Sequence, residues 1–430
     1  QEHTKHALDN LARKFTVDSQ RDALINFVKQ LENHPEHRYI AIQEGAIKLL
    51  KKFERFSNDR QIVEYSRIGL ALLGYVRKLP GNGIRILSMD GGGMRAIMVL
   101  KFLQKLEQIS NWKIHSLFDL ICGVSTGAVL VCAIAKDKNF SIPDGIQLYK
   151  YIGHEVFHRP STFDKISGAS RLVASHAYYD VDLWESLLKE HIGHERIIDT
   201  ARYDYVPKIC CVSTTISDVN IDAHVFRNYA FPLDIESEFS GSCKAELWEV
   251  VRASSAAPAY FGDFPLHGEL HQDGGILFNN PTTVAIHEAK CLWPDQEIEC
   301  VVSMGTGRSP NKFAKRDGIK IIGKNVLDEA VLSSSWKTKF LRILDSATDT
   351  EATHIILSDL LKSGRYFRMN PYLTEWLPMI ENRPEKIKLL EDDSEMYIRR
   401  NEDKFELVCD ILTRKRSFPK RIGENLMNLF

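Results

Sequence analysis

Residues 118–136 read FDLICGVSTGAVLVCAIAK, which joins an apolar strand-like run, a serine between two glycines and an apolar helix-like run. This order predicts a strand–turn–helix corner that lifts the hydroxyl of Ser125 out of the strand and places it at the start of the helix. Gly123 and Gly127 flank the serine because side chains there would clash with neighbouring backbone. The pattern Gly-x-Ser-x-Gly is weak by itself, so its strand and helix context carries the prediction.

Short apolar runs alternate with helical patterns on both sides of this corner. We predict strands at 84–89, 118–124, 205–213 and 299–304, and helices at 94–109 and 126–136. Strands that alternate with helices indicate an α/β fold, with three layers built around a mostly parallel sheet.

Three regions of the chain differ in pattern. Residues 1–79 show helical periodicity, and their segment 42–50 resembles part of an armadillo-type repeat, so we predict a helical, armadillo-like domain. The turn-rich linker Leu79-Pro80-Gly81-Asn82-Gly83 leads into the α/β core, which we place at 80–308. Residues 309–430 are more polar and predict a largely helical C-terminal extension.

The composition narrows the classes of function. Of the 430 residues 44% are hydrophobic, and the formal net charge of −1 argues against a nucleic-acid partner. Eight scattered cysteines without a C-x-x-C pair favour a reducing, intracellular compartment. The longest apolar stretch, 118–135, contains Asp119 and the glycine turn and does not predict a membrane span. The first residue is Gln1, which indicates a fragment or a processed form.

A second glycine-rich corner lies at Asp90-Gly91-Gly92-Gly93-Met94-Arg95-Ala96. Backbone N–H groups freed by consecutive glycines at a helix start can bind an anion, either a phosphate or the oxyanion of a tetrahedral intermediate. A dinucleotide loop fits poorly, because Ala96 replaces its last glycine and no acidic residue ends a second strand where one is expected.

A third motif, Gln272-Asp273-Gly274-Gly275, places a carboxylate in a turn after an apolar stretch. Alone it is typical of a structural Asx-turn. In combination with the other two corners, it completes the set that a hydrolase needs, namely a nucleophile, a base and an oxyanion hole.

The order Asp-Gly-Gly-Gly-x-Arg, Gly-x-Ser-x-Gly and Asp-Gly-Gly resembles the patatin-like phospholipase family, most closely its gamma-type calcium-independent phospholipase A₂ branch. The likeness extends over most of 80–410. It implies that Ser125 is the nucleophile and Asp273 the base of a dyad without histidine, and that no metal or cofactor takes part. It assigns the oxyanion hole to Gly91, Gly92, Gly93 and Arg95, and the supporting turns to Gly123, Gly127, Gly274 and Gly275.

Two departures from the family pattern concern the oxyanion segment. Met94 stands where a smaller residue is usual, and Ala96 replaces the last glycine of the motif. Neither change removes an oxyanion donor, and we expect either to narrow the acyl pocket or to shift the loop.

The resemblance implies calcium-independent hydrolysis of glycerophospholipid acyl esters to free fatty acid and lysophospholipid. A neutral-lipid lipase or an acyltransferase with the same site remains an alternative, and a non-catalytic lipid- or partner-binding module is a more remote one. The expected partners are a phospholipid membrane surface and, through the N-terminal helical domain, a protein partner or a second copy. The expected location is intracellular and peripheral, on mitochondria, endoplasmic reticulum or peroxisomes, although the last residues, 427–430, carry no peroxisomal tripeptide.

Other patterns leave alternatives open. His287 or His354 could be the third member of an ordinary triad, since both follow the serine and the aspartate in the chain. The run from His154 to His158 reads H-E-x-x-H, a zinc-protease signature, but Pro160 follows at once and Ser161 replaces the glycine of the extended form.

Two further local patterns are weaker. The segment 218–222 imitates the start of a calcium loop, yet Ala223 and Tyr229 stand where glycine and glutamate are required. A basic cluster fits either a solvated loop or contact with anionic lipid headgroups. It consists of Lys312, Lys315, Arg316, Lys320 and Lys324.

Overall fold

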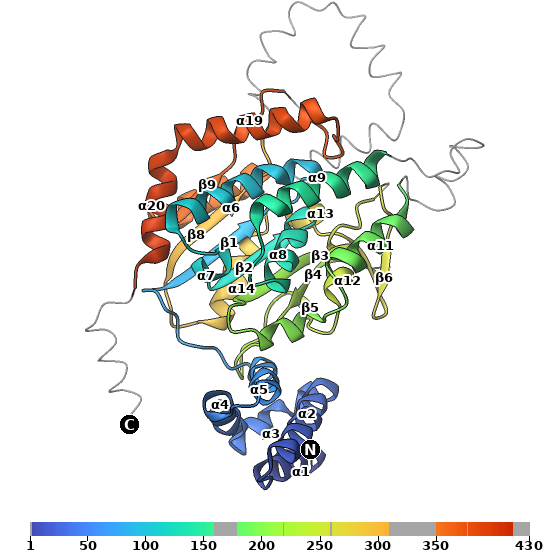
Figure 1. Cartoon of the computed structure of the whole chain (residues 1–430), viewed down its shortest axis with the longest axis vertical. Helices are drawn as coiled ribbons and strands as arrows, with labels where there is room; N and C mark the ends of the chain where they lie inside the picture. Colours follow the sequence, from blue (N-terminus) through green and yellow to red (C-terminus); the bar gives the residue numbers. More distant parts are fainter. Residues whose placement is uncertain are drawn as a thin grey trace, which may run out of the picture.

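The computed structural model describes residues 2–158, 179–217, 219–258, 260–308, 350–375 and 377–415. Figure 1 shows an α/β body with a smaller unit of helices, coloured blue, attached below it. The elements of this N-terminal unit are α1 (Glu2–Ala12), α2 (Val17–Asn33), η1 (Pro35–His37), α3 (Arg38–Gln43), α4 (Ala46–Phe56) and α5 (Arg60–Leu72).

The N-terminal helices bury the apolar stripe that their sequences predict. Leu24, Phe27 and Leu31 of α2 lie in one hydrophobic cluster with residues of α1, α4 and α5. The side chain of Asp59 accepts a hydrogen bond from the N–H of Ile62 and caps α5. Residues 2–72 are therefore helical as predicted, whereas their armadillo-like character remains a prediction.

A nine-stranded mixed sheet forms the centre of the α/β body. Its strands are β1 (Ile84–Met89), β2 (Leu120–Val124), β3 (Lys208–Ile216), β4 (Ile221–Arg227), β5 (Ser240–Ser242), β6 (Phe264–Leu266), β7 (Glu269–Asp273), β8 (Ile298–Met304) and β9 (Tyr366–Met369). The order is β5-β4-β3-β2-β1-β8-β9, and all neighbours from β3 to β9 along this path are parallel. Antiparallel pairs join β4 and β7 to β3, and β6 to β7.

The central strands are apolar on both sides because helices cover both faces of the sheet. Every residue of β1 and β2 is buried. Leu87 and Ile121 enter the hydrophobic cluster of one face, whereas Ile86, Leu120 and Val124 enter the cluster of the other. The protein is therefore an α/β structure of three layers around a mostly parallel sheet, as predicted.

The larger of these clusters contains residues of several helices that are labelled in Figure 1. These helices are α6 (Ile97–Ser110), α8 (Thr126–Lys136), α9 (Ile142–His158), α11 (Val181–His191), α12 (Leu247–Ser254), α19 (Pro384–Arg400) and α20 (Glu402–Thr413). The smaller cluster lies under α14 (Thr282–Leu292), whose Val284, Ala285 and Ala289 are fully buried.

The described part of the C-terminal region contributes to this same body. Strand β9 pairs with β8 at the edge of the sheet, and α19 and α20 pack against α6. A further helix, α18 (Thr350–Leu360), contacts α14 and β9. The division that we place between residues 308 and 309 remains a sequence prediction.

Most predicted central elements agree with the structure within a few residues. The strand predicted at 84–89 is β1, and the helix predicted at 126–136 is α8. The strand predicted at 205–213 begins later, at Lys208, and the short strands β4 to β7 and β9 were not predicted. No helix in the described ranges has the length and apolar character that crossing a membrane requires.

Candidate active site

The serine corner has the strained backbone that its glycines suggest. Ser125 has φ 53° and ψ −118°, a conformation that non-glycine residues rarely adopt, and α8 begins directly after it. A Cβ atom at Gly123 would lie 2.4 Å from the carbonyl oxygen of Gly127, and one at Gly127 would lie 2.3 Å from that of Met89. Both glycines are therefore needed for the close approach of the corner to its neighbours.

The register of β3 brings the serine and the aspartate together. Val124, the last residue of β2, pairs with Val212 of β3, and Asp273, the last residue of β7, pairs with the next residue, Ser213. Strand β7 thus continues alongside β3 where β2 ends. The Oγ atom of Ser125 donates a hydrogen bond of 2.7 Å to Oδ2 of Asp273.

The remaining contacts of this pair fix its geometry. The N–H of Gly275 donates to Oδ1 of Asp273 at 2.7 Å, so each carboxylate oxygen has one donor. The N–H of Ser125 donates at 2.8 Å to Oγ of Ser254, which itself donates to the carbonyl oxygen of Val212. Gly274 is also required, because a Cβ atom there would lie 2.3 Å from the same carbonyl oxygen.

The surroundings of Asp273 make it a stronger base than an ordinary carboxylate. Burial raises the pKa of Asp273 to about 6, against the lowering effects of the hydrogen bonds from Ser125 and Gly275. No cation contributes to this shift in the described part of the chain. A carboxylate that is desolvated in this way holds a proton more readily near neutral pH.

The glycine loop at 91–93 lies beside the serine, and its three N–H groups differ in their contacts. The N–H of Gly91 donates to the carbonyl oxygen of Asn279 at 3.3 Å, and that of Gly92 donates to Oγ1 of Thr126 at 3.1 Å. Gly92 and Gly93 line the same pocket as Ser125 and Asp273. Gly93 has φ 56°, in the left-handed region that favours glycine.

Hydrogen bonds from neighbouring residues fix the carbonyl groups of the glycine loop. The carbonyl oxygen of Gly92 accepts from the backbone N–H of Arg95 at 3.2 Å and from its Nε atom at 3.4 Å. The carbonyl oxygens of Gly91 and Gly93 accept from Thr306 Oγ1 at 2.9 Å and from the Tyr149 hydroxyl at 2.7 Å. Because the peptide is trans, fixing the Gly92 carbonyl directs the Gly93 N–H the opposite way.

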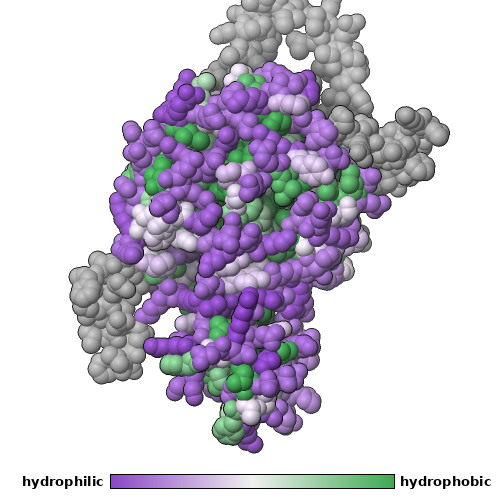
Figure 2. Space-filling view, viewed as in Figure 1, coloured by the Kyte–Doolittle hydropathy of each residue, from purple (hydrophilic) through white to green (hydrophobic). Residues whose placement is uncertain are grey.

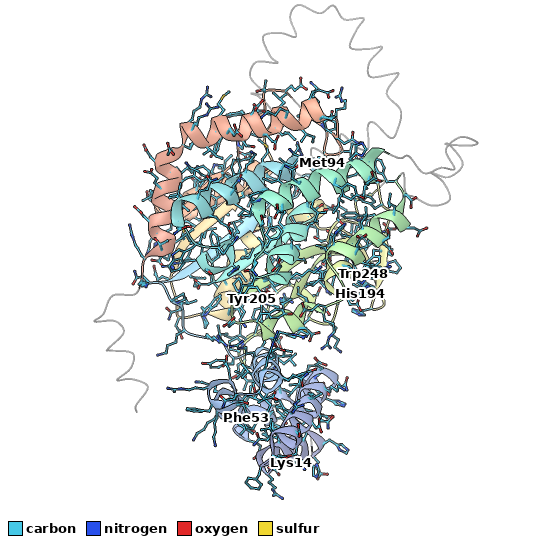
Figure 3. The ribbon with its side chains drawn as sticks, viewed as in Figure 1. Lys14, Phe53, Met94, His194, Tyr205 and Trp248 are labelled. Carbon is cyan, nitrogen blue, oxygen red and sulfur yellow. The ribbon has the colours of Figure 1, made fainter. Side chains whose placement is uncertain are left out.

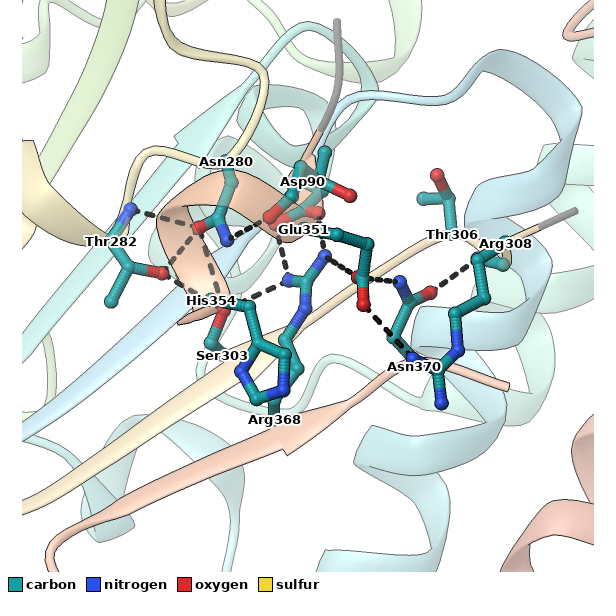
Figure 4. Close-up of polar contacts among 12 residues, drawn as sticks. Asp90, Asn280, Thr282, Ser303, Thr306, Arg308, Glu351, His354, Arg368 and Asn370 are labelled. Atoms are coloured by element: carbon teal, nitrogen blue, oxygen red, sulfur yellow. Dashed lines mark hydrogen bonds and ion pairs between the residues drawn. The ribbon is translucent and has the colours of Figure 1, made fainter. Parts of the chain in front are cut away.

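A buried ion pair anchors the residue that precedes the glycines. Asp90 accepts two hydrogen bonds from Arg368 of β9, at 2.9 Å and 2.6 Å, and both side chains are buried. Burial raises the pKa of Asp90, while the Arg368 guanidinium acts to lower it. Figure 4 shows how Glu351 and Asn370 continue this network toward Arg308.

An apolar pocket opens in front of the serine. Its walls come from α9, α11, the segment 255–261 and the segment 379–380, and their apolar members include Ile152, Phe157, Trp184, Tyr260, Phe261 and Ile380. Met94 also lines the pocket and packs closely over Gly153. This environment suits a long hydrocarbon chain.

Neither candidate for a third triad member contacts the pair. His287 accepts a hydrogen bond from the N–H of Glu238 at 3.2 Å, and Nδ1 of His354 lies 3.3 Å from the Tyr366 hydroxyl. Within the described residues, the contacts of the Asp273 carboxylate are to Ser125 and Gly275. The arrangement therefore suits a dyad.

The metal-like patterns and the basic cluster lie partly outside the described residues. His154 and Glu155 lie on α9, but the side chain of His158 and the basic cluster at 312–324 fall outside the described residues, as does Asp218 of the calcium-like segment. Among described side chains, three possible metal ligands meet at His34, Glu36 and His37, in the N-terminal unit.

Sequence reasoning missed several side chains that hold the site. The hydroxyls of Ser254, Thr126, Tyr149 and Thr306 each bind backbone of the serine corner or of the glycine loop. Thr126 stands inside the serine motif and could have been noticed. Thr306 stands in the glycine turn 304–307 after a predicted strand, and Ser254 stands in the segment 253–261 that resembles the family. The sequence did not assign either hydroxyl a contact, and Tyr149 lies in no motif, so the fold identifies their partners.

Comparison with known proteins identifies the family of this chain. The family profile for patatin-like phospholipase matches residues 87–286. The chain is 39% identical to a calcium-independent phospholipase A2-gamma of Homo sapiens, over 93% of this chain and 49% of that protein. It is 31% identical to phospholipase A I of Arabidopsis thaliana, over 95% of this chain and 34% of that protein.

A solved structure, VipD from Legionella pneumophila, aligns with 75% of this chain and 71% of its own, at 15% identity and a TM-score of 0.33, which is too low to add weight. This chain spans about half the length of the gamma-type relatives that it matches. The extent and identity of the matches confirm the predicted family, and the chain belongs to the patatin-like phospholipases.

Proposed function

We propose that this chain hydrolyses fatty-acyl esters of glycerophospholipids without calcium, through Ser125 and Asp273. The observation that carries the proposal is the 2.7 Å hydrogen bond from Ser125 Oγ to Asp273 Oδ2 at the floor of an apolar pocket. The names of its relatives, calcium-independent phospholipase A2-gamma and phospholipase A I, support the same substrate class.

The reaction begins when Ser125 Oγ attacks the carbonyl carbon of the ester and its proton passes to Asp273. The tetrahedral intermediate then expels the lysophospholipid oxygen, which takes the proton from Asp273. A water molecule next gives a proton to Asp273 and attacks the acyl-serine. Collapse of this second intermediate releases the fatty acid and restores the serine hydroxyl.

We assign the main oxyanion contact to the N–H of Gly93, which lines the pocket. A second contact comes from the N–H of Gly92, which also lines the pocket and must exchange its 3.1 Å hydrogen bond to Thr126 Oγ1 for one to the oxyanion. The N–H of Gly91 is bonded to the Asn279 carbonyl, so Gly91 holds the loop in place. Arg95 acts through the Gly92 carbonyl and orients the Gly93 N–H. The positive end of α8 adds to the stabilisation of negative charge at Ser125.

The proposal extends to the surface on which the enzyme works. A phospholipid membrane is the natural source of the substrate, and we expect peripheral binding there. Hydrolysis of neutral lipids and acyl transfer use the same dyad, and activity on vesicles of each lipid class separates these alternatives.

The test is fatty-acid release from phosphatidylcholine vesicles in excess chelator. We expect the parent to be active and Ser125→Ala to lose at least about 10³-fold of the rate. Ser186→Ala is the matched control, because Ser186 is an exposed serine of α11 whose hydroxyl donates to the carbonyl of Leu183. Full activity of Ser125→Ala would contradict the proposal, and an inactive parent on every lipid class would favour a binding module.

A further inference from the structure

A second pocket opens where the N-terminal unit meets the α/β body. It is bordered by the end of α5, the linker at 75–80, the start of β1 and the segment 201–208. Figure 3 places Tyr205 of this pocket on the lower side of the body, whereas Met94 of the acyl pocket lies at the upper side. The surface around the junction is mainly hydrophilic in Figure 2.

The two pockets lie at opposite ends of the parallel strands. Arg85 and Lys208 stand at or next to the beginning of β1 and β3, and Asp119 directly precedes β2. Ser125 follows the end of β2, so the five residues of that strand, about 17 Å, separate the two ends. The second pocket is therefore a separate site.

Cationic side chains outnumber carboxylates in this second pocket. Its cations are Arg67, Arg77, Lys78, Arg85 and Lys208, and its carboxylates are Asp119 and Asp204. Glu54 pairs with both Arg67 and Arg77, and Glu299 pairs with Arg85. Even with these partners counted, the positive charges exceed the negative ones.

Lys208 is the partly buried cation of this pocket whose charge has no anionic partner among the described residues. It is partly buried, and within the described residues its side chain has no hydrogen bond or ion pair; its Nζ atom lies 5.8 Å from the centre of the Tyr229 ring. Burial, and then the charge of Arg77, lower the pKa of Lys208 to about 8. A lysine in such a place costs stability unless an anion joins it.

We propose that this pocket binds a phosphate-bearing anion between Lys208 of the α/β body and Arg77 of the linker. A phosphate supplies negative charge and several acceptor oxygens to the two cations. The stacked rings of Tyr203 and Tyr205, 5.4 Å apart, form an aromatic wall for the group that carries the phosphate.

Such an anion would connect the two units of the chain. The N-terminal unit already meets the body through Arg67, which donates to the Arg202 carbonyl at 3.1 Å, and through Ala71, whose carbonyl accepts from Ala230 N–H at 3.0 Å. A phosphate bound beside these contacts adds a bridge between the N-terminal unit and the α/β body. Binding therefore stabilises the folded chain, and the stabilisation grows with the logarithm of the phosphate concentration once that concentration exceeds the Kd.

The experiment measures thermal unfolding of the whole chain in inorganic phosphate and in chloride at equal ionic strength. We expect phosphate to raise the Tm of the parent in a dose-dependent way. Lys208→Met should abolish this response and weaken phosphate binding about tenfold or more by calorimetry. In chloride, Lys208→Met should have a higher Tm than the parent, because it removes an uncompensated charge.

Three further variants keep the test sharp. Lys48→Met is the matched control, since Lys48 is an exposed lysine of α4 outside the pocket, and its phosphate response should equal that of the parent. Arg77→Gln should weaken the response even if Lys208→Met does not fold. Asp204→Asn should strengthen it, because it removes a carboxylate of the pocket. A parent without a phosphate-specific shift, or an unchanged response in both cation variants, overturns the proposal.

A vesicle arm distinguishes a lipid headgroup from a soluble phosphate. Phosphatidylcholine vesicles with and without phosphatidic acid are sedimented with the parent and with Lys208→Met. If the lysine variant loses the binding that depends on phosphatidic acid, the phosphate belongs to a lipid. If that binding is unchanged while the Tm response to inorganic phosphate is lost, the phosphate comes from solution.

Discussion

Two carboxylates flank the glycine loop, and their surroundings differ. Asp90, behind the loop, is buried and faces the guanidinium of Arg368 through two hydrogen bonds. Asp273, in front of it, borders the pocket and faces only a hydroxyl and one backbone N–H among the described residues. Burial raises the pKa of each group, but only Asp90 has a cation to hold its charge.

This difference separates a structural carboxylate from the one that we propose as the base. The Asp90–Arg368 pair joins the residue that follows β1 to β9, and each carboxylate oxygen of Asp90 accepts a hydrogen bond from the guanidinium. Asp273 lacks such a partner, so its most accessible proton source is Ser125. The same burial therefore stabilises a loop in one case and prepares a base in the other.

The largest expected effect concerns Asp273→Asn. This change should lower kcat by about 10³-fold or more, because the amide cannot accept the serine proton. It should also raise the free energy of unfolding at pH 7.5, on the order of 2 kcal/mol, because it removes a desolvated charge. Fatty-acid release and urea unfolding measure the two effects.

The sign of the stability effect depends on pH. Because folding raises the pKa of Asp273 from 3.8 to about 6, its contribution favours the folded state below pH 4 and is lost as the pH rises through 6. The advantage of Asp273→Asn should therefore vanish near pH 4. The exposed residue Asp410 provides the control, Asp410→Asn, which should change neither quantity.

The next largest effect concerns Arg368→Leu. Removing the guanidinium leaves Asp90 buried without its cation, which should cost about 3–5 kcal/mol of unfolding free energy. Arg365→Leu is the matched control, because Arg365 pairs with the exposed Glu297 and should cost at most about 1 kcal/mol. Urea unfolding checks both. Combining Arg368→Leu with Asp90→Asn should recover part of the lost unfolding free energy, because it removes the unpaired charge. If Arg368→Leu and Arg365→Leu lost the same unfolding free energy, the proposed difference between Asp90 and Asp273 would be wrong.

A third effect concerns the pH dependence of catalysis. The base must be deprotonated, so kcat/KM of the parent should rise about tenfold per pH unit below 6 and level off above it. The variant Asp90→Asn shows whether Asp273 or Asp90 causes the pH dependence of kcat/KM. The midpoint near 6 should persist in this variant if Asp273 is the base, and its disappearance would assign the titration to Asp90.

The sequence predicts the serine corner and its partner well because each depends on local chemistry. The strand before Ser125, the helix after it and the glycines around it are all consequences of a short stretch of chain. The strands β1 and β8 are short runs in which apolar residues predominate, so the local pattern predicts these parts of the core.

What the sequence does not reveal depends on distant contacts. Strand β7 reads GluLeuHisGlnAsp, with little β character, and is a strand because β3 continues past the end of β2 and offers it a partner. Likewise β9 holds Arg368, whose partner Asp90 lies 278 residues away. Neither pairing has a local signal, so the β7 strand and the ion pair behind the loop emerge only from the fold.

The smallest effect concerns Tyr149→Phe. The Tyr149 hydroxyl donates at 2.7 Å to the carbonyl of Gly93 and so helps to orient the loop that carries the proposed oxyanion donors. Losing one neutral hydrogen bond is worth about 1 kcal/mol, so kcat should fall about fivefold. KM should stay nearly constant, because the apolar walls that contact the acyl chain are unchanged.

A second tyrosine of α9 provides the control for Tyr149→Phe. Tyr151→Phe alters an exposed tyrosine of the same helix and should leave kcat unchanged. If Tyr149 served packing alone, its phenylalanine variant would keep kcat and lose only stability. A drop in kcat without a change in KM, which Tyr151→Phe does not show, would instead indicate that the Tyr149 hydroxyl of α9 positions the glycine loop. This result is expected if the hydrogen bond to the Gly93 carbonyl orients the loop.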